Sequence, residues 1–229
     1  FIDRPCRIRL QSSRRTEPPY ARKDWCNDFY SRSLSITEQK AVLATSKSDD
    51  PYIDGRFMGS ENILNGDKVF FLSAEEAENA AYGFTDVNAR IANYGDSAGG
   101  WWLRSPHQDY NNSAGVVDAS GGVRIEWVND VNAARPAFNL KPDSVLLVSA
   151  AVGGKGAADG IFKIPEYSGD EWKLTLLDDT RTFKVTETTA AGKPGGTVTL
   201  NFSGARTGLN EYISAIIEGE GGAAHYGRI

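Results

Sequence analysis

The stretch Trp101-Trp102-Leu103-Arg104-Ser105-Pro106 is followed further along the chain by Ala134-Arg135-Pro136-Ala137-Phe138-Asn139-Leu140. Both stretches are largely apolar, and each carries one arginine close to a proline. Residues 107–132, which lie between them, are polar, interrupted by glycine and without a clear hydrophobic period. Two apolar anchors that hold a permissive polar insert indicate a scaffold that displays a surface. An enzyme would instead need titratable side chains that converge on one point.

The length of 229 residues fits one large or two ordinary domains. The composition, 40% hydrophobic and 24% charged, is that of a soluble globular protein. The net charge of -5 argues against sequence-independent nucleic-acid binding, which needs a basic face. No apolar run approaches the ~20 residues that a membrane helix needs, so we expect no membrane insertion.

The start of the chain and its two cysteines leave the cellular compartment open. The first residue is Phe1, which suggests that the chain begins inside a longer protein, and no signal peptide is visible. Cys6 and Cys26 have a spacing that a disulfide could bridge, while two buried thiols are an equal alternative. Neither lies in a Cys-x-x-Cys or Cys/His cluster, so we expect no zinc site.

Local signals predict an α+β arrangement over residues 1–142. The sequences Ser35-Ile36-Thr37-Glu38 and Ser73-Ala74-Glu75-Glu76 fit capping boxes, which predict helices ending near Leu43 and Tyr82. A helix or a turn is expected over 24–29, and a loop over 47–66. Strands are expected over 68–72, 101–104, 114–118, 122–127 and 134–140. One of the two adjacent tryptophans should be in the core, and its neighbour, which faces the other way, could support the binding surface. Phe138 is also expected in the core.

The pattern changes after Lys141-Pro142-Asp143, so we place a domain boundary between residues 142 and 143. Turns rich in glycine separate short apolar runs, and no helix is predicted in this part. The expected strands lie at 145–149, 161–164, 172–177, 182–187, 197–202, 212–218 and 226–229. This spacing predicts an all-β, immunoglobulin-like sandwich over residues 143–229.

Three stretches of the sequence resemble a family with a domain of unknown function that is common in gut Firmicutes and their phages. They are the two anchors and Asp67-Lys68-Val69-Phe70-Phe71-Leu72-Ser73-Ala74-Glu75-Glu76-Ala77. Its pattern is similar to W-W-L-R-S-P, then V-R-P-A-x-x-L, preceded by D-K-V-F-L-L-S-x-x-E-A. Phe71 replaces one leucine and Ala134 the usual valine, and the likeness covers about residues 25–140. The resemblance implies a C-type lectin-like fold over residues 1–142, as in variable proteins that retroelements diversify. A lectin fold does not by itself imply sugar binding.

The resemblance further implies that residues 107–132 form a variable, ligand-binding surface. Aromatic side chains and arginine supply rigid contact area and hydrogen bonds there. Arg104 and Arg135 are instead expected to form structural hydrogen bonds. The candidate contacts are His107, Gln108, Asp109, Tyr110, Asp118, Arg124, Glu126, Trp127 and Asn129.

Metal and catalytic sites are not expected. Asp109, Asp118, Glu126 and Asp130 could offer oxygen ligands, but no compact calcium-binding run or lectin calcium triplet is present. The sequence contains two histidines and shows no Ser-His-Asp order, phosphate-binding loop or zinc-protease motif. We therefore expect no catalytic residues, metal or cofactor.

These observations predict a non-enzymatic receptor-binding protein, located outside the cell, on a cell surface or on a virion. Its partner would be a protein or glycan receptor, and the second domain would space or tether the first. The alternative is a structural adhesin module in which residues 107–132 are a passive surface.

Overall fold

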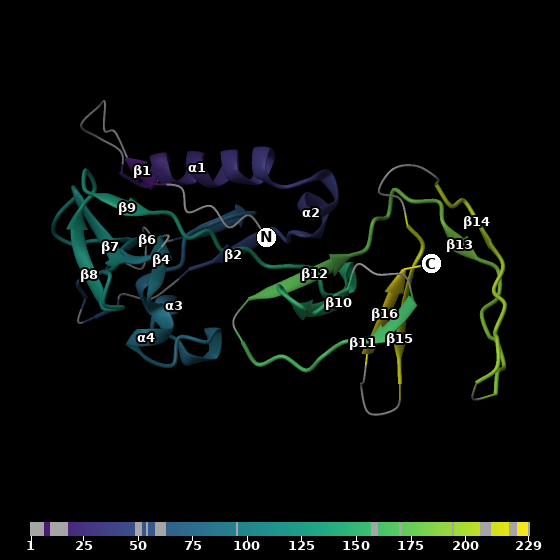
Figure 1. The fold of residues 1–229 in the computed structure, drawn as a ribbon. Helices are drawn as coiled ribbons and strands as arrows, with labels where there is room; N and C mark the ends of the chain where they lie inside the picture. Colours follow the sequence, from purple (N-terminus) through teal and green to yellow (C-terminus); the bar gives the residue numbers. More distant parts are fainter. Residues whose placement is uncertain are drawn as a thin grey trace. The chain divides into compact units, whose positions relative to one another are not determined.

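The computed structural model describes residues 7–9, 18–48, 52–53, 55–57, 63–94, 96–156, 160–169, 171–193, 195–206, 212–219 and 224–228. The chain is a mixed α+β protein that is rich in sheet (Figure 1). It divides into two compact units, Phe1–Lys141 and Pro142–Ile229. No helix in the described residues is long and apolar enough to span a membrane.

The first unit contains the described helices and a five-stranded sheet. Its elements are β1 (Arg7–Arg9), α1 (Pro18–Ser33), α2 (Ile36–Ala41), β2 (Thr45–Lys47), β3 (Leu64–Asp67), α3 (Ala74–Ala77), the 3-10 helix η1 (Ala80–Tyr82), α4 (Val87–Arg90), β4 (Ala92–Tyr94), β5 (Ser97–Gly99), β6 (Trp101–Pro106), β7 (Ser113–Val117), β8 (Val123–Trp127) and β9 (Val131–Ala133).

The five-stranded sheet has the order β1-β9-β6-β7-β8. β1 pairs antiparallel with β9, so the beginning of this unit is joined to a segment near its end. β6, β7 and β8 pair antiparallel in chain order, while β6 and β9 run parallel. β8 is therefore an edge strand of this sheet, which places one side of the β7–β8 hairpin at the surface.

Both faces of the sheet are covered by apolar side chains. Trp101 belongs to a cluster with Phe57 and Phe84 on one face, and Trp102 belongs to a cluster with Cys26 and Phe71 on the other. The two tryptophans point to opposite faces because side chains alternate along a strand. Both are buried, with exposures of 0% and 1%. Neither therefore contributes to the surface of the protein.

The two capping boxes are confirmed, but the second helix is shorter than predicted. Ser35 caps α2, and Ser73 caps α3, with the glutamate three residues on closing each box. α3 ends at Ala77 instead of continuing to Tyr82. The side chain of Asn79 accepts a hydrogen bond from the backbone N–H of Ala81 and starts η1 as a separate turn. An asparagine that bonds its own neighbouring backbone competes with helix continuation in this way.

Two predicted strands of this unit are wrong in their extent. The apolar run 68–72 is packed in the core but is not a strand of a β-ladder. The strand in this region is β3, at Leu64–Asp67. The run 134–140 makes isolated bridges only, Phe70 with Ala137 and Val42 with Leu140. A continuous apolar run indicates that its residues are buried, and buried residues need not belong to a β-sheet. Phe138, expected in the core, is 38% exposed.

α1 is longer than the expected helix or turn at 24–29, and it places one of the two cysteines. Cys26 is buried among the residues that cover the Trp102 face of the sheet. Cys6, and with it the alternative of a Cys6–Cys26 disulfide, lies outside the described residues.

The described residues of the second unit form short strands and a 3-10 turn. Its elements are η2 (Pro142–Ser144), β10 (Val145–Ala150), β11 (Gly160–Lys163), β12 (Trp172–Leu176), β13 (Lys184–Val185), β14 (Phe202–Ser203), β15 (Ser214–Glu218) and β16 (Ala224–Arg228). The strands pair as β10-β12, β11-β16-β15 and β13-β14. Of the strand expected at 197–202, only the last residue, Phe202, lies in a strand, which is β14. Many apolar side chains of this unit are exposed, Val152, Phe162, Leu200 and Phe202 among them.

Candidate functional site

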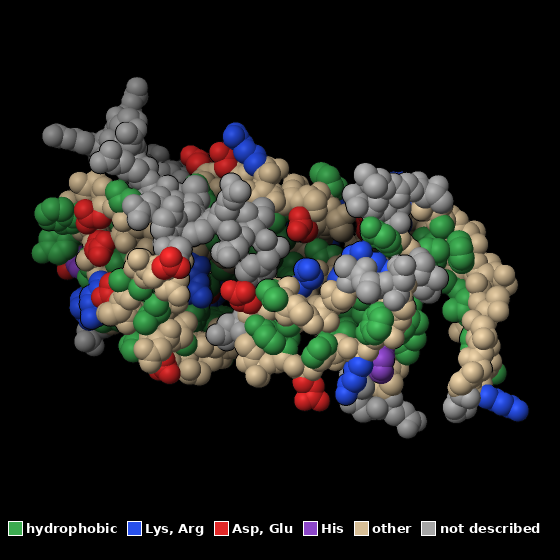
Figure 2. Space-filling view, viewed as in Figure 1, with side chains coloured by type: hydrophobic (Ala, Val, Ile, Leu, Met, Phe, Trp, Pro, Cys, Tyr) green, Lys and Arg blue, Asp and Glu red, His purple; other side chains and the backbone are tan. Residues whose placement is uncertain are grey.

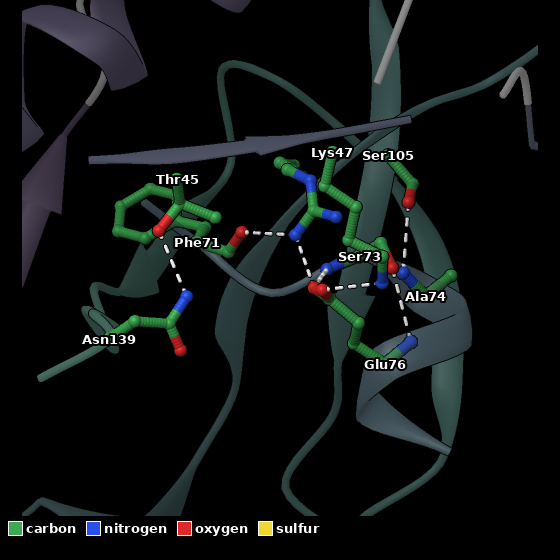
Figure 3. Close-up of polar contacts among 9 residues, drawn as sticks. Thr45, Lys47, Phe71, Ser73, Ala74, Glu76, Ser105 and Asn139 are labelled. Carbon is green, nitrogen blue, oxygen red and sulfur yellow. Dashed lines mark hydrogen bonds and ion pairs between the residues drawn. The ribbon is translucent and has the colours of Figure 1, made fainter. Parts of the chain in front are cut away.

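The arginine side chains of the two apolar anchors form contacts within the scaffold. The guanidinium of Arg104 donates to the carbonyl oxygen of Phe71, at 2.9 Å, and to the carboxylate of Glu76. Lys47 Nζ lies 2.8 Å from the other oxygen of that carboxylate. Figure 3 shows Lys47 next to the Glu76 carboxylate, with Ser73 and Ala74 at the start of α3 beside them. The predicted structural role of Arg104 is confirmed.

Glu76 remains ionised in this buried position because cationic groups and N–H donors surround it. Burial alone would raise the pKa of the Glu76 carboxyl. The hydrogen bond and the charge of Arg104, together with Lys47 and the backbone N–H of Ser73, outweigh that effect and lower the pKa below its ordinary value. The backbone N–H of Ala74 is satisfied by Ser105 Oγ, at 2.9 Å. α3 and β6 are thus joined by buried polar contacts.

Arg135, the arginine of the second anchor, also has a structural role, as predicted. Its guanidinium lies 4.8 Å from the ring centroid of Trp101 and 5.3 Å from that of Phe84. It donates to the carbonyl oxygen of Arg90, at 3.4 Å, which also accepts from Trp101 Nε1, at 3.0 Å. Both arginines of the anchors therefore hold the core and are not available to a ligand.

The β7–β8 turn is fixed against α4. Arg90 Nε donates to the carbonyl oxygen of Gly121, at 2.7 Å. Gly121 has φ +82°, and a Cβ at this position would lie 1.8 Å from the carbonyl oxygen of Val87. This turn requires glycine for both its left-handed conformation and its close packing. The hairpin, which carries four of the nine candidate contacts, is therefore held at its turn.

A pocket of about 400 Å³ lies at the opposite end of this hairpin. The pocket brings together four of the nine predicted contacts with three residues that were not among them. Its lining residues are His107, Tyr110, Ser113, Ile125, Glu126, Trp127 and Asp130. Figure 2 shows exposed hydrophobic side chains with acidic side chains beside them in the region of β8.

His107 positions the loop that closes one side of the pocket. The residue is buried, and its backbone forms an isolated bridge with Phe57. Its Nδ1 accepts hydrogen bonds from the backbone N–H groups of Asp109, at 3.0 Å, and Tyr110, at 3.2 Å. The His107 and Tyr110 ring centroids are 4.8 Å apart. The histidine ring thus fixes the loop and supports the Tyr110 ring.

The aromatic surface of the pocket is exposed to solvent. Tyr110 is 61% exposed and Trp127 is 63% exposed. Ile125 lies on the same strand face as Trp127, because residues two apart share a face. The alternation of Val123, Ile125 and Trp127 was the signal that could have added Ile125 to the predicted contacts. Large aromatic surface held on a rigid strand is the usual composition of a binding site.

The residues that line the pocket include Ser113, Glu126 and Asp130, and the pairing of Glu126 with Ala114 places the Glu126 side chain on the face of β8 opposite that of Trp127. Glu126 Oε2 accepts a hydrogen bond from Asn132 Nδ2, at 2.6 Å. The backbone N–H of Asp130 donates to the carbonyl oxygen of Trp127, at 2.8 Å, which closes the turn after β8. Ser113 Oγ donates to Asn112 Oδ1, at 3.4 Å, and not to the histidine. These contacts do not assemble a serine nucleophile with a base.

Asp118 and Arg124 lie at the turn end of the hairpin, away from the pocket. The Asp118 carboxylate accepts from Ser120 and from the backbone N–H of Gly122, and it pairs with Arg124 at 3.3 Å. The hydrogen bond from the Ser120 hydroxyl is the main reason that the pKa of Asp118 is lowered. Arg124 is three residues from Trp127, on the opposite face of the strand and about 10 Å along it.

The other predicted contacts are exposed but do not line the pocket. These are Gln108, Asp109 and Asn129. The backbone N–H of Gln108 donates to the carbonyl oxygen of Arg56, at 2.8 Å, so the loop is anchored while its side chains face solvent. Among the described residues, no three His, Cys, Asp or Glu side chains form a group that could hold a metal ion.

Residues 21–142 match the model of the family described as Domain of unknown function (DUF6273). Since this match covers more than half of the chain, the chain belongs to that family. No curated protein and no solved structure matches the chain.

Proposed function

We propose that this member of the DUF6273 family is a non-enzymatic binding protein whose contacts with its receptor lie at the pocket of His107, Tyr110 and Trp127. The observation that carries the proposal is the exposure of Tyr110 and Trp127, 61% and 63%, beside a pocket in a rigid hairpin. Two neighbouring aromatic side chains left in water are a cost to a protein that uses them only for folding. Buried in an interface, the same side chains contribute much of the binding energy.

The rigidity of the scaffold favours binding at this place. Tyr110 and Trp127 have few rotatable bonds, so ordering them in a complex costs little entropy. The loop of Tyr110 is tied to His107 Nδ1, and the strand of Trp127 is tied to the core through β7. A preorganised surface of this kind binds more tightly than a mobile one with equal contact area.

We further propose that the surface varies between related chains, in a C-type lectin-like first domain, residues 1–142, diversified by a retroelement. The support is that Gln108, Asp109 and Asn129 are exposed, whereas Trp101, Trp102 and Leu103 of the preceding motif are buried. β7 lies inside the proposed variable window but is buried along its whole length. Variation would therefore spare β7 and fall on the exposed positions of residues 107–132. Sequencing the DNA that encodes 107–132 in close relatives and in a near-identical repeat tests this pattern; changes concentrated in β7 would contradict it.

The second domain, residues 143–229, is proposed to be immunoglobulin-like and to space the binding domain from a cell surface or a virion. Its short antiparallel pairs and the absence of α-helix among its described residues support this assignment. The location outside the cell belongs to the same proposal.

The test of the binding function is a glycan and protein array probed with the intact protein. We expect a partner, and we expect Tyr110→Ala or Trp127→Ala to weaken its binding by ~2 kcal/mol, roughly thirtyfold. Tyr82→Ala is a matched control, because Tyr82 is 55% exposed on η1 and does not line the pocket. We expect EDTA to have no effect. Full binding by a Tyr110→Ala/Trp127→Ala double variant would refute the proposal, and a passive surface would then be the better description.

A further inference from the structure

We propose that the outer edge of β8 is a docking surface for a second copy of this chain, which pairs there through its own β8. The two strands run antiparallel about a two-fold axis at Ile125 and join two sheets into one. Three observations carry the inference: the end position of β8 in its sheet, the direction of its backbone groups, and the distribution of charge along the strand. The inference goes beyond the proposed receptor binding and does not depend on it.

β8 is the last strand of the five-stranded sheet, and its pairing with β7 shows which of its backbone groups face inward (Figure 1). The backbone N–H of Asp118 donates to the carbonyl oxygen of Gly122, at 2.9 Å. At the other end of the hairpin, the backbone N–H of Val128 donates to the carbonyl oxygen of Asn112, at 2.9 Å. Hydrogen-bonded and non-bonded pairs alternate along an antiparallel ladder, so the even-numbered residues of β8 direct their N–H and C=O groups toward β7.

The odd-numbered residues of β8, which are Val123, Ile125 and Trp127, therefore direct their N–H and C=O groups to the outer edge. Two of these carbonyl oxygens have a local partner, because that of Val123 accepts from Arg124 Nη1 and that of Trp127 accepts from the N–H of Asp130. Among the residues that the structure describes, no strand pairs with this edge. The open side of an edge strand is a template for pairing with another chain.

The sequence of β8, Val123-Arg124-Ile125-Glu126-Trp127, is complementary to itself in the antiparallel direction. When Ile125 lies opposite Ile125 of the second copy, Arg124 lies opposite Glu126 in both halves of the pair. Residues that are directly opposite have Cβ atoms about 4.5–5.5 Å apart, and unlike charges stabilise such a pair. On the other face of the strand, Val123 lies opposite Trp127. Charged side chains thus meet on one face and apolar side chains on the other.

The backbone of β8 fits the same register. Ile125 exchanges two N–H···O hydrogen bonds with its counterpart, and the N–H of Trp127 faces the Val123 carbonyl oxygen, which can accept a second hydrogen bond. The two neighbouring registers are centred on Arg124 or on Glu126, and each places a side chain opposite its own copy. Like charges directly opposite each other are destabilising. Charge therefore selects the register that is centred on Ile125.

The contacts that these side chains make within the chain leave this pairing possible. Arg124 pairs with Asp118 at 3.3 Å, and Glu126 accepts a hydrogen bond from Asn132 through one oxygen, Oε2. The Arg124 side chain is 61% exposed, and an exposed ion pair contributes little to stability, so exchanging or sharing it costs little. Charged side chains often prevent the pairing of edge strands. Against a second copy that protection needs like charges, whereas the charges on the two sides of Ile125 have opposite sign.

A dimer of this kind places both candidate pockets on the same side of the joined sheet. The two-fold axis between two antiparallel strands is perpendicular to the sheet, so the face that carries Ile125 and Trp127 points the same way in both copies. Two pockets on one side could bind two receptors on one surface, which would raise the avidity without any new contact.

The first experiment is sedimentation velocity of the full chain over a range of protein concentrations, at low and at high salt. We expect a dimer that grows with concentration and weakens with salt. Amide hydrogen exchange tests the surface: the N–H groups of Ile125 and Trp127 should become protected as the dimer forms, whereas those of Arg124 and Glu126 face β7 and should be protected at every concentration. A chain that stays monomeric up to roughly 1 mM overturns the inference.

The decisive variants are Arg124→Glu and Glu126→Arg, each of which places like charges opposite each other in both halves of the pair. We expect each variant alone to dimerise at least about tenfold more weakly than the native chain. Mixed in equal amounts, the two variants should form a heterodimer, because every charge is then opposite one of the other sign. The double variant Arg124→Glu/Glu126→Arg should dimerise by itself for the same reason.

The matched control is Arg32→Glu, which reverses a charge on α1 whose side chain is 78% exposed, and it should leave the dimer unchanged. Urea unfolding of each variant identifies any loss of folding. The inference is overturned if both single variants dimerise like the native chain, or if folded variants form no heterodimer and the double variant stays monomeric. These outcomes leave the receptor site untouched, because Tyr110→Ala tests that site without changing β8.

Discussion

The buried contact between Arg104 and Glu76 predicts that Glu76→Gln strongly destabilises the first unit. The side chains are 9% and 5% exposed, so the substitution leaves the Arg104 guanidinium buried beside a neutral amide. Removing one partner of a buried pair costs ~3–5 kcal/mol, out of a total stability of about 5–15 kcal/mol for a domain. Glutamine preserves the size of the side chain and its place in the capping box. The measured loss of stability can therefore be attributed to the loss of the negative charge.

The assay is unfolding in urea and on heating, followed by tryptophan fluorescence, because Trp101 and Trp102 lie in the two clusters of this unit. The expected fall in melting temperature is roughly 10–20 °C, at about 3–4 °C per kcal/mol. Lys47→Met is the control. Lys47 contacts the same carboxylate but is 35% exposed, so its loss should cost about 1 kcal/mol or less.

A double variant, Arg104→Met/Glu76→Gln, sharpens this test because it removes both buried charges together. It should be more stable than Glu76→Gln alone, since no guanidinium then stays buried without a charged partner. The reasoning is refuted if the free energy of unfolding of Glu76→Gln lies within about 1 kcal/mol of that of the native chain. It is also refuted if the loss of stability in the double variant equals the sum of the losses in the two single variants.

Four further measurements test the scaffold. The pKa of the Glu76 carboxyl is lowered in the folded state. Its ionisation therefore contributes fully to stability above the unfolded pKa of about 4.3, and this contribution is lost as the pH falls through the folded pKa. The free energy of unfolding should therefore decrease less steeply with falling pH in Glu76→Gln than in the native protein. Trp102→Ala should cost roughly 3 kcal/mol or more, and Phe138→Ala distinctly less in the same melts because Phe138 is 38% exposed; equal losses would contradict the assignment of the core. Gly121→Ala should cost at least ~1–3 kcal/mol, and a native melting temperature would show that the turn relaxes away from Val87. Alanine at Gln108 or Asn129 should change stability by less than ~0.5 kcal/mol in urea titrations, and a larger loss would show that these side chains support the fold.

Local interactions explain the parts of the fold that were predicted correctly. A capping box joins residues three apart, so Ser35 with Glu38 and Ser73 with Glu76 determine where two helices begin whatever surrounds them. The β7–β8 hairpin is also local, with its turn at Gly121 and its strands in register through Val117 and Val123. The aromatic and acidic residues of the candidate site lie in and beside this hairpin, which is why composition could point to the segment that carries them.

The sequence by itself thus determined the helix starts, the hairpin and the segment that carries the exposed aromatic side chains. Tertiary structure decided the rest, because burial and long-range pairing depend on contacts between residues far apart in the chain. Pairing of β1 with β9 and burial of both Trp101 and Trp102 come from the sheet. The pocket forms where the His107–Tyr110 loop lies beside the end of β8. This contact between separate segments places Asp130 and Ile125 in the site.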